Sequence, residues 1–119
     1  MRILIVDDSK AMRMMVTRAL RQAAGRNHTF EEASDGAAAL EAIRASAPDL
    51  VLSDWNMPKM SGIELLETLR ASGPDVKFGF VTSEGSGEMR ERALKAGALF
   101  VMTKPFTPEA FQRALEGVL

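Results

Sequence analysis

Five residues able to take part in chemistry stand at or just beyond the ends of short apolar runs. They are Asp7, Asp8, Asp54, Thr82 and Lys104. Three carboxylates brought together repel one another, and one lysine offsets only one of the charges, so a divalent cation would relieve the remainder. Carboxylate oxygens are hard ligands that favour Mg²⁺, or Mn²⁺, over softer metals. The sequence has no cysteine and a single histidine on an unrelated run, so a zinc site is not expected.

The same residue types suit phosphoryl transfer. A carboxylate beside a divalent cation is able to attack a phosphoryl group and form an aspartyl phosphate. The cation would neutralise phosphoryl oxygens, while the Lys104 ammonium and the Thr82 hydroxyl would bind others. The residues therefore predict phosphoryl transfer to an aspartate.

These residues can cooperate only if the fold brings the ends of the runs together. Short apolar runs alternate with longer amphipathic stretches along the whole chain. The pattern predicts strands over 3–6, 28–32, 50–53, 76–81 and 99–102. It predicts helices over 10–24, 36–46, 61–71, 87–96 and from Thr107 to the C-terminus. This alternation implies a single α/β domain of parallel strands, whose carboxyl ends meet at one edge where ligands bind.

Two sequence patterns describe helix starts and faces. Ser61 and Glu64 match a capping box, and Thr107 with Pro108 matches an N-cap followed by proline at the first helical position. Helix 10–24 has an apolar side and an opposite basic side. The basic residues are Lys10, Arg13, Arg18 and Arg21. We interpret them as a solvated face, with a docking surface for an acidic partner as the alternative.

Composition limits the class of protein. The chain has 119 residues, the size of one domain, and a formal net charge of −1. This charge gives no overall attraction to nucleic acid or to an anionic membrane. No apolar run reaches the roughly 20 residues of a membrane helix. We therefore expect a cytoplasmic protein that binds neither nucleic acid nor membrane. A monomer is expected as well, although the sequence leaves the oligomeric state open.

The combination of Asp7-Asp8, Asp54, Thr82 and Lys104-Pro105 resembles the receiver domains of two-component response regulators, and the resemblance extends over residues 1–119. It implies a flavodoxin-like, doubly wound sheet of five parallel strands in the order 2-1-3-4-5, with helices on both faces. It also implies a Mg²⁺-dependent phosphoacceptor that receives its phosphoryl group from a sensor histidine kinase. Such a regulator catalyses only its own phosphorylation and dephosphorylation.

The resemblance assigns a role to each matching residue. Asp54 would be the phosphoacceptor and would bind the metal ion together with Asp8 and the backbone carbonyl of Asn56, with Asp7 acting through water. Thr82 would bind a phosphoryl oxygen. Lys104 would pair with Asp54 and then with its phosphate, and the Lys104–Pro105 peptide bond would be cis.

One position departs from the family pattern. Receiver domains usually carry an aromatic residue three positions before the conserved lysine, and this sequence has Val101 there, with Phe100 one position earlier. Strand alternation places these two side chains on opposite faces of the sheet, so Phe100 cannot take the aromatic role. The usual relay from threonine to the aromatic residue is therefore in question.

The chain offers no residues for a separate effector domain, so the output is expected to be contact with a downstream protein through the fourth and fifth strands and their helices. Asn56 and Glu84 match residue types of chemotaxis regulators, although other family members carry them too. Two alternatives remain. One is an interaction module that is never phosphorylated, which should have lost the acids or the lysine. The other is a phosphatase with an aspartate nucleophile, which normally carries Asp-x-Asp after the first strand.

Overall fold

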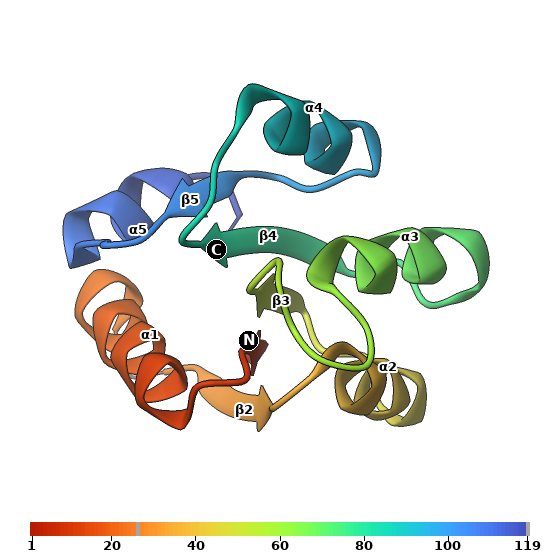
Figure 1. The fold of residues 1–119 in the computed structure, drawn as a ribbon. Coiled ribbons are helices and arrows are strands. Elements are labelled where there is room, and N and C mark those ends of the chain that lie inside the picture. Colours follow the sequence, from red (N-terminus) through yellow and green to blue (C-terminus); the bar gives the residue numbers. More distant parts are fainter. Residues whose placement is uncertain (26, 119) are drawn as a thin grey trace.

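The computed structural model describes residues 1–25 and 27–118, in which strands and helices alternate (Figure 1). The strands are β1 (Arg2–Val6), β2 (Thr29–Ala33), β3 (Leu50–Ser53), β4 (Lys77–Thr82) and β5 (Val101–Thr103). The helices are α1 (Lys10–Ala24), α2 (Gly36–Ala45), α3 (Gly62–Ser72), α4 (Gly87–Lys95) and α5 (Pro108–Ala114). All strand pairs are parallel, and the order across the sheet is β2-β1-β3-β4-β5. The predicted α/β fold and strand order are confirmed.

Two predicted boundaries are wrong, and the others agree to within one residue. Strand β5 begins at Val101 rather than at Leu99, although the Leu99 amide still donates to a β4 carbonyl at 2.8 Å. Helix α5 ends at Ala114 instead of continuing to the C-terminus. Gly117 follows with a φ of +78°, a left-handed conformation that an α-helix does not contain.

Every helix begins at a side chain that accepts a hydrogen bond from the backbone amide three residues later. These capping residues are Ser9, Asp35, Ser61, Ser86 and Thr107. The predicted capping box is present, because the Glu64 side chain also accepts from the Ser61 amide at 3.1 Å. The caps satisfy amides that a helix leaves unpaired, and they fix where each loop from the preceding strand ends.

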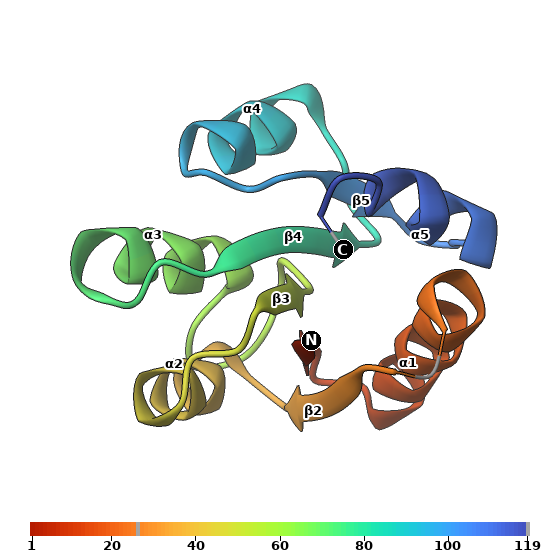
Figure 2. The same cartoon turned by 180° about the vertical axis from the view of Figure 1, so that it is seen from behind.

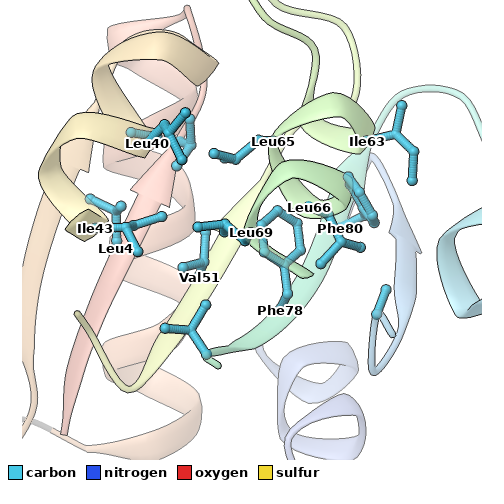
Figure 3. Close-up of a cluster of buried hydrophobic side chains, with 14 of the residues drawn as sticks. Leu4, Leu40, Ile43, Val51, Ile63, Leu65, Leu66, Leu69, Phe78 and Phe80 are labelled. Atoms are coloured by element: carbon cyan, nitrogen blue, oxygen red, sulfur yellow. The ribbon is translucent and has the colours of Figure 1, made fainter. Parts of the chain in front are cut away.

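Helices cover both faces of the sheet (Figures 1 and 2). Helices α1 and α5 lie on one face, and α2, α3 and α4 lie on the other. On the second face, Figure 3 shows side chains of α2 and α3 packed on the strands. They include Leu40, Ile43, Leu66 and Leu69 over Leu4, Val51, Phe78 and Phe80.

Among the described residues, no helix combines the length and apolar character needed to cross a lipid bilayer.

Gly79 in β4 allows the ring of Phe100 to lie directly over the strand. A Cβ atom at position 79 would come within 2.5 Å of the ring. We expect Gly79→Ala to lower the free energy of unfolding by about 1–2 kcal/mol, because Phe100 must move from its place against the core. Chemical denaturation would measure this loss. Combining the change with Phe100→Leu should recover part of it, and additive losses would contradict the explanation.

Candidate functional site

The polar residues predicted from the sequence meet at the carboxyl edge of the sheet. Backbone hydrogen bonds continue past the strands at this edge. The Asp54 amide donates to the last carbonyl of β1 at 2.9 Å, and the Lys104 amide donates to the Thr82 carbonyl at 2.8 Å. The Asp7 amide donates to the end of β2 at 3.2 Å. Neighbouring strands therefore hold the backbones from which these side chains project.

Lys104 lies between two of the carboxylates. Its Nζ atom is 3.0 Å from Asp7 Oδ2 and 3.4 Å from Asp54 Oδ2. These three side chains are largely buried, with exposed fractions of 14% for Lys104, 5% for Asp7 and 12% for Asp54. Asp8 is exposed, and one oxygen from each of the three aspartates lies within 4.8 Å of the others. The structure thus places Asp7, Asp8, Asp54 and Lys104 together, as the sequence predicted.

The site has more negative charge than its own groups neutralise. Backbone amides of Ser9 and Trp55 donate to Asp7 Oδ1 at 2.9 Å and to Asp54 Oδ1 at 2.7 Å. Burial nevertheless raises the pKa of Asp54 above its ordinary value; the Lys104 ammonium opposes this rise, and the Asp7 carboxylate adds to it. Three hard oxygen donors with this excess charge fit a divalent cation such as Mg²⁺.

The remaining predicted site residues flank this cluster. Thr82 ends β4 and is fully buried, and its Oγ1 atom accepts a hydrogen bond from the Glu84 amide at 3.2 Å. Asn56 is exposed in the loop between β3 and α3, two residues beyond Asp54. The Lys104–Pro105 peptide bond is cis, as expected. The roles of Thr82 and Asn56 stay predictions.

The departure at position 101 has the geometry expected from strand alternation. Val101 is buried among the side chains under α2, α3 and α4, whereas Phe100 packs with the cluster on the α1 and α5 face. Phe100 therefore does not replace the missing aromatic residue. Arg90 of α4 reaches β5 and donates to the Val101 carbonyl at 3.1 Å.

Arg13 is a contributor to the site that the sequence analysis missed. Its Nη1 atom donates to the Asp7 carbonyl at 2.7 Å, and its Nε atom pairs with Glu32 at 2.8 Å. The side chain is only 15% exposed, so its assignment to a solvated face was wrong. A helical wheel could not have found it, because the contact depends on how α1 lies beside the end of β1 and on β2.

A doubly wound parallel sheet with an acid cluster at its carboxyl edge defines the class of α/β domains that bind their ligands at the strand ends. The sequence matches the family model of the response regulator receiver domain over residues 3–116. The chain therefore belongs to the response regulator receiver domain family, and it is a regulatory component of two-component signalling. Members of this family generally bind Mg²⁺ and interact with a histidine kinase and downstream targets.

Its relatives include chemotaxis regulators. The chain is 36% identical to the probable chemotaxis protein CheY of Rhizobium etli, over 98% of this chain and 91% of that protein. It is also 36% identical to the chemotaxis protein CheY1 of Helicobacter pylori, over 100% of this chain and 97% of that protein. The solved structure of Vibrio cholerae CheY4 superposes with a TM-score of 0.84 at 33% identity, covering 99% of this chain and 98% of that one.

The raised pKa of Asp54 has a consequence for stability. Asp54 holds its proton more tightly in the folded protein than in the unfolded chain. As the pH rises above the ordinary pKa of 3.8, this difference lowers the free energy of unfolding, and the loss is complete once the pH exceeds the raised pKa. We expect Asp54→Asn to raise the melting temperature of the metal-free protein at pH 7. The gain should shrink as the pH is lowered toward the ordinary pKa of aspartate. Thermal unfolding in a chelator at several pH values would measure it, and a lower melting temperature for the variant at pH 7 would contradict the charge argument.

Proposed function

We propose that Asp54 accepts a phosphoryl group from the phosphohistidine of a sensor histidine kinase. The observation that supports this most directly is the position of Lys104, whose Nζ atom contacts both Asp7 and Asp54 at a site with excess negative charge. Magnesium would be held by Asp8, by Asp54 and by the backbone carbonyl of Asn56, with Asp7 acting through water. Bound there, the cation would supply charge neutralisation for the phosphoryl oxygens.

The reaction forms one bond and breaks one. A carboxylate oxygen of Asp54 bonds to phosphorus as the phosphorus–nitrogen bond of the donor breaks, and the bonding electron pair leaves with the imidazole nitrogen. Lys104 already contacts Asp54 Oδ2 and would pair with the phosphoryl group that forms beside it. Thr82 Oγ1 accepts from the Glu84 amide, so its own proton is free to be donated to a phosphoryl oxygen. Hydrolysis of the acyl phosphate at the same site would end the signal.

The phosphorylated domain would signal by changing the face formed by α4, β5 and α5, which would bind a downstream protein target. The chemotaxis relatives, together with Asn56 and Glu84, favour a chemotaxis pathway. The protein would work in the cytoplasm, where the phosphorylated domain of the kinase lies, and as a monomer. Because Val101 replaces the usual aromatic residue, transmission to this face would not use an aromatic side chain that changes position.

Small phosphodonors test the proposal without a kinase. With phosphoramidate and Mg²⁺, we expect the intact mass of the protein to rise by one phosphoryl group, because Asp54 is the attacking carboxylate. Asp54→Asn should remain unmodified, and removing Mg²⁺ with a chelator should abolish the reaction of the native chain. No mass increase in the native protein would favour an interaction module that is never phosphorylated. Steady turnover of a phosphate ester would favour a phosphatase.

Trp55 provides a test of metal binding. Its amide donates to Asp54 Oδ1, its ring centroid lies 4.9 Å from that of Phe80, and it is the only tryptophan in the chain. We expect its fluorescence to change on titration with Mg²⁺. Asp8→Asn removes an exposed charged ligand and should raise the Mg²⁺ concentration at the midpoint by about 10-fold or more. An unchanged midpoint would remove Asp8 from the ligand set.

A further inference from the structure

The loop of residues 54–61 lies between β3 and α3 and carries Asn56, the proposed carbonyl ligand. This loop passes close to the start of α2 (Figure 1). Gly36 occupies the first position of α2, directly after the capping residue Asp35. A Cβ atom built at Gly36 would lie 2.8 Å from Met60 Cβ and nearer still to the Met60 carbonyl oxygen. Ordinary contacts begin at 3.4 Å, so the loop and the helix approach more closely than a side chain at position 36 permits.

We propose that Gly36 and Asp35 are positioning residues for the metal and phosphoacceptor site, because they set the place of the loop that presents Asn56 beside Asp54. This inference rests on the proposed function. It assigns the start of α2 a role in metal binding although none of its atoms would touch the ion.

The loop is held together by its own hydrogen bonds, so a displacement at Met60 would not be absorbed locally. The Gly62 amide donates to the Trp55 carbonyl at 2.8 Å, and the Met60 amide donates to the Pro58 carbonyl at 2.7 Å. The capping box at Ser61 fixes the end of the loop at α3. A shift at Met60 is therefore transmitted toward Trp55 and the neighbouring Asn56.

The close packing at Gly36 determines the position of the loop more than the nearby ion pair does. Lys59 Nζ lies 3.8 Å from Asp35 Oδ2, but the Lys59 side chain is 73% exposed. An exposed ion pair of this kind contributes little. Asp35 itself is buried, and its Oδ1 atom accepts from the Ala38 amide at 2.7 Å. This cap fixes the first turn of α2, which in turn fixes Gly36 against the loop.

Gly87 provides a matched control for Gly36. It also follows a capping residue and opens a helix, α4, but a Cβ atom there would meet nothing within 4 Å. Alanine favours both helices equally, so the two sites differ mainly in the close contact of the buried Gly36 with Met60. We expect Gly36→Ala to weaken Mg²⁺ binding about 10-fold or more and to slow modification by phosphoramidate. Gly87→Ala should leave both properties at the native values.

Three measurements on the full chain separate the outcomes. Calorimetric titration gives the Mg²⁺ affinity, intact mass against time gives the phosphorylation rate, and thermal unfolding in a chelator gives the stability without metal. A folded Gly36→Ala with native affinity and rate would overturn the inference. Failure of the native chain itself to be phosphorylated would instead refute the proposed function, and the Mg²⁺ affinities would still test the positioning role.

A second pair of variants covers the case in which Gly36→Ala does not fold. Asp35→Ala and Ser86→Ala each remove one helix cap, because both side chains accept a bond from the third helical amide. We expect Mg²⁺ affinity to fall several-fold for Asp35→Ala alone. Equal Mg²⁺ affinities for the two variants would overturn the positioning role, because removing the cap of α2 would then affect the site no more than removing the cap of α4.

Discussion

Repulsion among carboxylates at the carboxyl edge of the sheet is the constraint on which the rest of this structure depends. Asp7 and Asp54 are largely buried, Asp8 is close by, and Lys104 is the ammonium group between the first two. Burial raises the pKa of Asp54 even with Lys104 beside it, so the folded protein keeps an acid that costs stability. A divalent cation bound as proposed would relieve the same repulsion and so would stabilise the folded protein.

The parallel sheet is what makes this crowding possible. Residues 7, 54 and 104 are far apart in the chain, yet each follows a strand and donates its amide to the neighbouring strand. Their side chains therefore start from backbones that are fixed by the sheet rather than by flexible loops. The loop after β3 is the exception, since the proposed metal site would also require it to present the Asn56 carbonyl. Its own hydrogen bonds and the glycine contact with α2 supply the rigidity that the sheet does not.

The sequence predicted most of the fold because its signals are local. The buried run Leu50–Ser53, the capping box at Ser61 and the proline at position 108 each mark an element without reference to the rest of the chain. The convergence of the acids followed from the strand alternation and from a rule about parallel sheets. Arg13 and the contact between Gly36 and Met60 could not be predicted, because each depends on how two elements lie against one another. The end of α5 was missed because a glycine near a chain end gives only a weak signal.

The residue at position 101 bears on the proposed route between the site and its output surface. Phe100 lies over Gly79 on the α1 and α5 face, so its ring is separated by the sheet from the side where Val101 packs. Hydrogen bonds to backbone carbonyls also connect the β5 region to its neighbours. The Lys104 amide bonds to the Thr82 carbonyl, and Arg90 bonds to the Val101 carbonyl. A displacement of Lys104 would therefore act on the same short strand that Arg90 ties to α4. Under the proposed function, the path from the site to the surface would run through this strand and the Arg90 guanidinium group.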